Sequence, residues 1–162
     1  MAISTTATTT NSTQDQTGLE AMKGVVLQWV DVVNSGTLDG IGSVWADDCV
    51  VHAGGGLPEV RGVESLGGLL TAYRAALSHL HITTQDLVAE GDKVAARFTT
   101  RGRHDGEFLD MPATGVPIEI GGFGLFRIAD GRIAEEWLLD DLASFISQVK
   151  IVSALAQTGG AS

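Results

Sequence analysis

Apolar residues recur along the first part of the chain at intervals of three and four, which is the repeat of one helix face. The clearest run ends at Asn34-Ser35-Gly36, a stretch typical of a helix end. Two more helices are predicted, a short one near 38–45 and a longer one near 62–79. The residues that define the first helix face are Leu19, Met22, Val26, Trp29 and Val33.

After His79, strict alternation of apolar and polar residues replaces this repeat and predicts strands. An earlier strand is predicted by the β-branched run over 49–53, and Asp130-Gly131 predicts a hairpin turn. Helices followed by a meandering sheet indicate an α+β fold, with three N-terminal helices packed in a curved antiparallel sheet around a cone-shaped cavity. The alternating segments are 81–90, 93–104, 116–128 and 132–140, and a final helix is predicted over 142–156.

The two ends of the chain differ from this pattern in composition. Residues 1–17 are mostly Thr, Ser, Asn and Gln, which offer little apolar surface to bury, so a disordered tail is predicted. A disordered end is predicted for 158–162 as well, which leaves a single domain over 18–157. The N-terminal segment also has neither the basic start nor the apolar run that is typical of a secretory signal.

The charge balance argues against several classes of partner. Ten Lys and Arg residues stand against 20 Asp and Glu residues, a net charge of −10. Binding to nucleic acid or to an anionic membrane surface depends on clustered basic residues, so neither is expected. No apolar run reaches the ~18 residues that a membrane span needs. Cys49 is the only cysteine, which excludes an internal disulfide and favours a reduced, cytoplasmic setting.

The last predicted strand carries the strongest candidate for catalysis. Burial beside aromatic and aliphatic side chains would raise the pKa of Asp141, and the adjacent Asp140 would raise it further. Asp141 is therefore the predicted general acid/base, with Asp140 as the neighbouring alternative. The competing interpretation is that one of the pair caps the final helix, since Asp is a favoured N-cap. Alternation places five residues on the more apolar face, which is expected to line the cavity: Ile133, Glu135, Trp137, Leu139 and Asp141.

Other residues are candidates for the same cavity. His52 and His104 can orient a substrate oxygen or shuttle a proton, or they can be structural histidines. Glu135 is either a second polar cavity residue or the ion-pair partner of Arg97 or Arg101 on a neighbouring strand. Four aromatic residues can bind substrate in the cavity or fill the core: Trp29, Trp45, Phe123 and Trp137.

No cofactor and no metal site is predicted. His79 and His81 do not have a recognised ligand spacing. The run Gly54-Gly55-Gly56 is not followed by the Gly-Lys-Ser/Thr of a phosphate-binding loop. Cys49 lies in a Val-rich strand, where a buried, inert thiol is the expected outcome.

Four stretches of the chain, between about residues 19 and 149, resemble the SnoaL-like polyketide cyclases of the nuclear transport factor 2-like superfamily. The loop that begins at Gly102 and the Pro-x-Thr-Gly that follows it are the most specific. The stretches are Asn34-Ser35-Gly36-Thr37-Leu38-Asp39, Gly102-Arg103-His104-Asp105-Gly106-Glu107-Phe108-Leu109, Pro112-Ala113-Thr114-Gly115 and Asp130-Gly131-Arg132-Ile133-Ala134-Glu135-Glu136-Trp137.

The resemblance implies a cone-shaped α+β fold and a cofactor-free enzyme of polyketide antibiotic biosynthesis. Cyclases of this family close a ring by intramolecular aldol condensation, and an aspartate near the end of the last strand acts as acid and base. By its spacing from Trp137, Asp141 matches that aspartate. The chain departs from the family at Glu136, where His is common, and at Gly124-Leu125-Phe126, where polar residues occur.

The resemblance predicts a cyclase that acts on a bulky, hydrophobic polycarbonyl or aromatic substrate. An isomerase, a hydrolase or another acid/base enzyme on the same fold is the first alternative, and a non-catalytic small-ligand-binding module is the second. The chain has Trp29 and Ala53 where ketosteroid isomerases have a Tyr and the base Asp, which counts against that isomerase. A homodimer through the convex face of the sheet is expected, because Ala95, Arg97 and Thr99 leave that face without strong charge.

Overall fold

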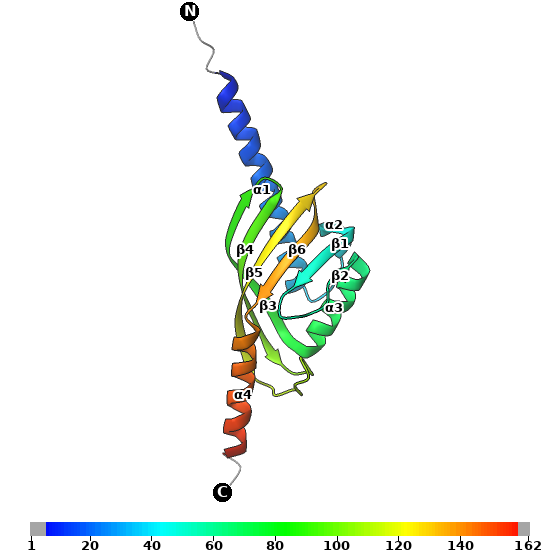
Figure 1. The fold of residues 1–162 in the computed structure, drawn as a ribbon, viewed down its shortest axis with the longest axis vertical. Helices are drawn as coiled ribbons and strands as arrows, with labels where there is room; N and C mark the ends of the chain where they lie inside the picture. Colours follow the sequence, from blue (N-terminus) through cyan, green and yellow to red (C-terminus); the bar gives the residue numbers. More distant parts are fainter. Residues whose placement is uncertain (1–5, 159–162) are drawn as a thin grey trace, which may run out of the picture.

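Residues 6–158, the part of the chain that the computed structural model describes, form one six-stranded sheet flanked by helices (Figure 1). The order of the strands across the sheet is β2-β1-β6-β5-β4-β3. The predicted α+β class is confirmed. The strands are β1 (Trp45–Ala53), β2 (Val60–Arg61), β3 (Leu77–Glu90), β4 (Lys93–His104), β5 (Pro117–Ala129) and β6 (Arg132–Asp140).

One pair of neighbouring strands departs from the predicted antiparallel arrangement. Strands β1 and β6 run parallel, whereas the other four neighbouring pairs are antiparallel. A hairpin turn forces two strands to be antiparallel, but β1 and β6 are separated by most of the chain, so no turn sets their relative direction. The two-residue strand β2 was not predicted, because so short a segment carries no readable alternation.

The helices are α1 (Thr6–Asn34), α2 (Ile41–Val44), α3 (Val63–Ala76) and α4 (Leu142–Thr158). The predicted end of the first helix is confirmed, but its predicted start was wrong, because residues 6–17 continue α1. Once the apolar turns have nucleated a helix, each further residue extends it at low cost. Residues 1–5 and 159–162, the rest of the predicted disordered ends, lie outside the described residues.

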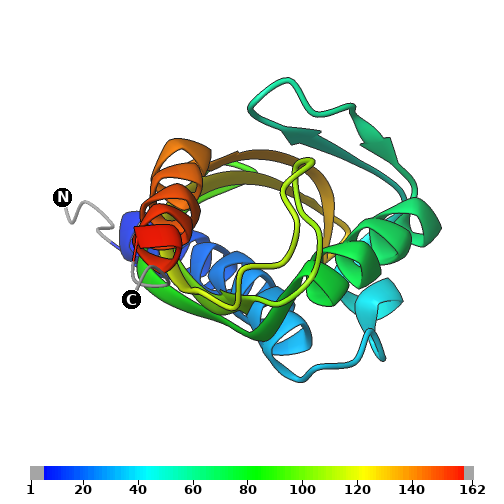
Figure 2. The same ribbon diagram turned by 90° about the horizontal axis from the view of Figure 1, so that it is seen from below.

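The sheet curves around the interior of the fold, and α1 lies within the curve (Figure 2). Helix α1 packs mainly against β3, α3 packs against β1, and α4 packs against β5. On β4, Val94, Ala96 and Phe98 face the core together, as alternation predicted. The concave side of the sheet and the two helices α1 and α3 therefore enclose the interior in which a ligand site can form.

A β-bulge in β6 decides which of its side chains reach that interior. Ile133 pairs with Ile128 of β5, and Glu135 pairs with the adjacent Arg127, so Ala134 is an extra residue in β6. Ile133 is fully buried, as predicted. Beyond the bulge the alternation is inverted, so the predicted cavity face of β6 was wrong from Glu135 onward.

Candidate active site

An apolar cavity lies between the concave face of the sheet and helices α1 and α3. It has two adjoining lobes, which we call the Trp29 lobe and the Phe108 lobe after one residue unique to each. Their volumes are about 100 Å³ and about 130 Å³, respectively. The residues that line both lobes are Ala53, Leu69, Leu70, Tyr73, Leu138 and Asp140.

Two carboxyl groups from β6 enter this apolar space. Asp140 lines both lobes, and burial raises the pKa of its carboxyl to about 6. Glu136 lines the Trp29 lobe and is only 4% exposed. Burial, and then the negative charge of Asp140, raises the pKa of Glu136 to about 8. Among the described residues that line the two lobes, none is a Lys, Arg or His, so no cation offsets these carboxyls.

Two hydroxyl groups complete the polar part of the cavity. The phenol of Tyr73, on α3, lines both lobes, and burial followed by the charge of Asp140 raises its pKa. Tyr73 is therefore a neutral hydrogen-bond donor beside a carboxylate. Thr100, on β4, is buried and lines the Trp29 lobe. The cavity thus contains one base, Asp140, with a raised pKa, together with neutral hydrogen-bond donors, and its walls are apolar.

Asp141, the predicted acid/base, does not enter the cavity. Its carboxylate caps helix α4, where it accepts hydrogen bonds from the backbone N–H of Ser144 at 3.0 Å and from the hydroxyl of Ser144 at 2.6 Å. These hydrogen bonds lower the pKa of Asp141, and the side chain is exposed. The predicted position was wrong because the bulge at Ala134 inverts the alternation, and the competing interpretation of a helix cap is confirmed.

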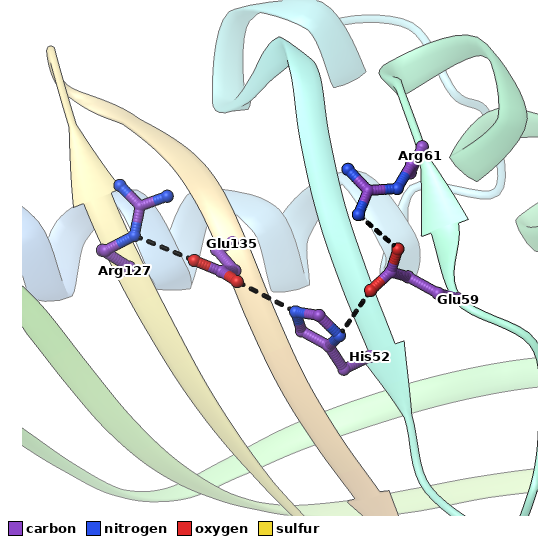
Figure 3. Close-up of polar contacts among 5 residues, drawn as sticks. All are labelled: His52, Glu59, Arg61, Arg127 and Glu135. Carbon is purple, nitrogen blue, oxygen red and sulfur yellow. Dashed lines mark hydrogen bonds and ion pairs between the residues drawn. The ribbon is translucent and has the colours of Figure 1, made fainter.

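His52 and Glu135 lie on the outer face of the sheet, in a chain of polar side chains joined by hydrogen bonds and ion pairs (Figure 3). The Nδ1 of His52 lies 2.9 Å from Glu59, and its Nε2 lies 2.9 Å from Glu135. Glu135 also accepts a hydrogen bond of 3.0 Å from Arg127, and the hydrogen bonds from His52 and then Arg127 lower its pKa. The predicted cavity position of His52 and Glu135 was therefore wrong.

The expected partners of Glu135 are engaged elsewhere. Arg97 pairs with Asp86, and Arg101 pairs with Glu119. Neither arginine contacts Glu135, because the bulge in β6 brings Arg127 of the adjacent β5 opposite this residue. Glu135 does form an ion pair with an arginine, as that interpretation expected, but the arginine is Arg127 and the predicted partners were wrong.

The remaining candidates divide between core and surface. Trp29 lines the cavity, whereas Trp45 is fully buried in the core, with its ring edge-on to Trp29 at a centroid distance of 5.3 Å. Phe123 and Trp137 are 59% and 38% exposed. Each belongs to the alternating set of side chains that points to the outer face of its strand, β5 or β6. Three of the four predicted aromatic cavity residues therefore do not line it.

His104 is buried and lines neither lobe. Its Nδ1 lies 3.0 Å from the hydroxyl oxygen of Thr114, and its ring packs edge-on against Phe145. Burial lowers the pKa of His104, which favours the neutral ring. These contacts tie the loop after β4 to α4 and match the structural interpretation of this histidine.

Sequence reasoning missed Glu136 and Tyr73 as cavity residues. Glu136 was assigned to the outer face by strict alternation, although its departure from the family pattern marked the position. Tyr73 is the only tyrosine and lies within the helix predicted near 62–79, where it was not singled out. The hydroxyl of Tyr73, a polar group on a helix that was expected to pack against the core, was the signal that could have identified this residue.

Two further findings bear on the kind of site. Of the helices in the described range, none is long and apolar enough to cross a membrane. Among residues 15–151, whose side chains the structure describes, no group of three or more His, Cys, Asp and Glu side chains is arranged to hold a metal ion. Cys49 is a free, fully buried thiol, as predicted.

Known proteins share this fold and parts of this sequence. An aklanonic acid methyl ester cyclase of Streptomyces peucetius is 34% identical over 79 residues, which are 48% of this chain and 54% of that protein. A second such cyclase, from Streptomyces sp. strain C5, has the same identity over 49% of its length. The chain therefore spans about half the length of the curated relatives that it matches.

Solved structures match over most of the chain. A candidate polyketide cyclase of Streptomyces antibioticus, IdmH, is 30% identical, with a TM-score of 0.71 over 80% of this chain and 98% of that one. A SnoaL-like protein of Jannaschia sp. shares the fold at 21% identity, with a TM-score of 0.73 over 80% of this chain and 92% of that one. The family model described as SnoaL-like polyketide cyclase matches residues 23–149. The chain belongs to the SnoaL-like polyketide cyclase family, and its curved α+β fold is the nuclear transport factor 2-like fold that the sequence predicted.

Proposed function

We propose that the protein is a cofactor-free polyketide cyclase that closes a ring by general acid–base catalysis, with Asp140 as the base. The observation that carries the proposal is the position of Asp140, a half-buried carboxyl that lines both lobes and whose pKa is raised to about 6. A base with a pKa near the working pH is mostly ionised there and still accepts a proton readily.

The proposed reaction is an intramolecular aldol addition, the ring-closing step of an aldol condensation. The carboxylate of Asp140 removes a proton from a carbon between two carbonyl groups and leaves an enolate. The enolate carbon then bonds to the carbon of another carbonyl group in the same molecule, and the electron pair of that C=O bond moves to its oxygen. The resulting alkoxide takes the proton back from Asp140, so the product is an isomer of the substrate. Tyr73, beside Asp140, is positioned to donate a hydrogen bond to that oxygen.

The charge of the cavity favours a substrate without a carboxylate. Asp140 and Glu136 supply only negative or neutral groups, and no Lys, Arg or His is among the described residues that line the two lobes. A free carboxylate there would be desolvated without a counter-charge. The named substrate of the two curated relatives is a methyl ester, in which the acid carries no charge. We therefore propose an esterified, hydrophobic polycarbonyl substrate.

Two copies of the chain are proposed to associate through the outer face of the sheet, as the sequence suggested. Apolar side chains are exposed there side by side, which is unusual for the surface of a monomer. A second copy buries such a face by symmetry, and two-fold dimers are the commonest homo-oligomers. The residues are Val88 at 66% exposure, Phe123 at 59%, Leu125 at 37%, Trp137 at 38% and Leu139 at 62%.

The test compares Asp140→Asn with Asp141→Asn, the same chemical change at adjacent positions. Loss of a general base typically lowers turnover by about 10²–10⁴-fold, so Asp140→Asn is expected to fall in that range on a polyketide methyl ester. Asp141→Asn is expected to keep turnover close to wild type, because Asn also caps helices well. Equal turnover in Asp140→Asn and wild type would refute Asp140 as the base, and a wild-type protein that binds the ester without turnover would favour a ligand-binding module.

A further inference from the structure

One buried polar group of the cavity is left without a role in the proposed proton transfer. The carboxyl of Glu136 is 96% buried and lines the Trp29 lobe. Within the described part of the chain this carboxyl has no hydrogen-bond or ion-pair partner, and only burial and the charge of Asp140 shift its pKa. Buried polar groups in native proteins are nearly always hydrogen-bonded, so an exception of this kind calls for an explanation.

The surroundings of Glu136 favour its protonated form. The titratable groups near it are Asp140 on the same strand, Cys49 on β1 and Tyr73 on α3, and none of them carries a positive charge. Burial is the main cause that raises the pKa of Glu136 to about 8. Unlike a carboxylate, a protonated carboxyl has an O–H that donates a hydrogen bond. At neutral pH the Trp29 lobe therefore contains an unused donor.

We propose that Glu136 donates a hydrogen bond to a carbonyl oxygen of the substrate in the Trp29 lobe and so determines which part of the molecule reaches Asp140. The inference rests on the proposed function of the same cavity. Glu136 and Asp140 are four positions apart on β6, so their Cα atoms lie roughly 13 Å apart at the usual rise of a strand. Glu136 therefore anchors a carbonyl remote from the carbon that Asp140 deprotonates, and the substrate must carry keto groups at both places.

The shape of the lobe restricts the group that this donor can hold. Trp29 and Phe98 form aromatic walls, and Val51 and Ile82 add aliphatic ones. An aromatic ketone satisfies both requirements, because its ring packs on these walls while its oxygen accepts from Glu136. A hydrocarbon of the same shape would leave the donor unpaired, and a carboxylate would face two acidic groups. The lobe is therefore specific for an uncharged aryl ketone.

The test uses two probes of the same skeleton, 1-tetralone with a keto oxygen and tetralin without one. The full-length protein is expected to bind tetralone about tenfold more tightly than tetralin, since one buried hydrogen bond is worth about 1.4 kcal/mol. In Glu136→Leu the ratio of the two dissociation constants is expected to fall to about one. In Glu136→Gln, which keeps an N–H donor, the ratio is expected to stay within about threefold of wild type.

Two further measurements separate this inference from the function on which it rests. Above pH ~8 the wild-type ratio is expected to decline as Glu136 ionises, whereas the ratio of Glu136→Gln is expected to stay constant. Asp140→Asn is expected to keep the tetralone preference while it loses turnover. A preference that persists in Glu136→Leu overturns the anchoring role of Glu136 and leaves the role of Asp140 intact. Full turnover in Asp140→Asn overturns the proposed base instead.

Discussion

The buried carboxyl of Glu136 is expected to destabilise the fold at neutral pH, and Glu136→Gln is expected to remove that cost. Glutamine has nearly the same shape and is neutral at every pH, so the substitution isolates the ionisation of residue 136. The pKa of Glu136 is raised from 4.5 to about 8 in the folded state. Between these values the folded protein holds a proton that the unfolded chain has released, so stability falls as pH rises.

The magnitude follows from the shift in pKa. The usual pKa of Glu is 4.5, so the unfolded chain has released this proton at pH 7, which is 2.5 pH units higher. One unit corresponds to 1.36 kcal/mol, so the expected gain in unfolding free energy for Glu136→Gln is about 3 kcal/mol at pH 7. At pH 5 the same calculation gives about 1 kcal/mol. A gain of about 3 kcal/mol corresponds to a rise in Tm of roughly 6–12 °C for a domain of this size.

The assay is urea unfolding of wild type and Glu136→Gln at pH 5 and pH 7, with Glu135→Gln as the matched control. The titration of Asp140 is common to all three proteins and cancels in the comparison. The folded state lowers the pKa of Glu135 below its unfolded value of 4.5. The ion pairs of Glu135 therefore stabilise the fold above pH 4.5, and this stabilisation is lost only as the pH falls below that value. Glu135→Gln is therefore expected to lose stability at both pH 5 and pH 7, without the gain expected of Glu136→Gln. A stability gain for Glu136→Gln that does not change between these two pH values would refute the reasoning.

The outer face and the buried thiol give two further predictions. Val88→Asp places a charge on the exposed apolar face and is expected to convert a dimer to a monomer in sedimentation, with unchanged turnover per chain; Thr71→Asp, exposed on helix α3, is the control. A wild-type protein that sediments as a monomer at high micromolar concentration would contradict the proposed interface. Cys49 is fully buried and burial raises the pKa of its thiol, so a thiol reagent is expected to modify it only at the rate of unfolding. Rapid modification in the absence of denaturant would contradict this.

Local patterns along the sequence determined most of the elements. Strands β4 and β6 have the predicted bounds, and helix α1 ends where Asn34-Ser35-Gly36 predicted. These features depend on side-chain periodicity and on turn residues, which act between near neighbours in the chain. The family motifs also pointed to the correct fold, because they record the same local requirements in related sequences.

Only the tertiary structure decided which carboxyl enters the cavity. Both alternating sets of β6 contain acidic and apolar side chains, so the composition of the strand does not show which one faces inward. The extra residue at Ala134 inverts the phase, and a bulge depends on pairing with β5 and β1, which lie elsewhere in the sequence. This single irregularity places Asp140 in the cavity and makes Asp141 a helix cap.

The pairing of strands that are distant in the sequence also determined where the other candidate site residues lie. His52 on β1 meets Glu135 on β6 because these two strands run side by side in parallel, an arrangement with no local signal in the sequence (Figure 3). The pKa values of Glu136 and Asp140 also depend on tertiary structure, since burial by residues from several elements raises them. The sequence by itself thus determined most of the elements and the family, whereas long-range packing determined the chemistry of the site, because desolvation and strand register exist only in the folded chain.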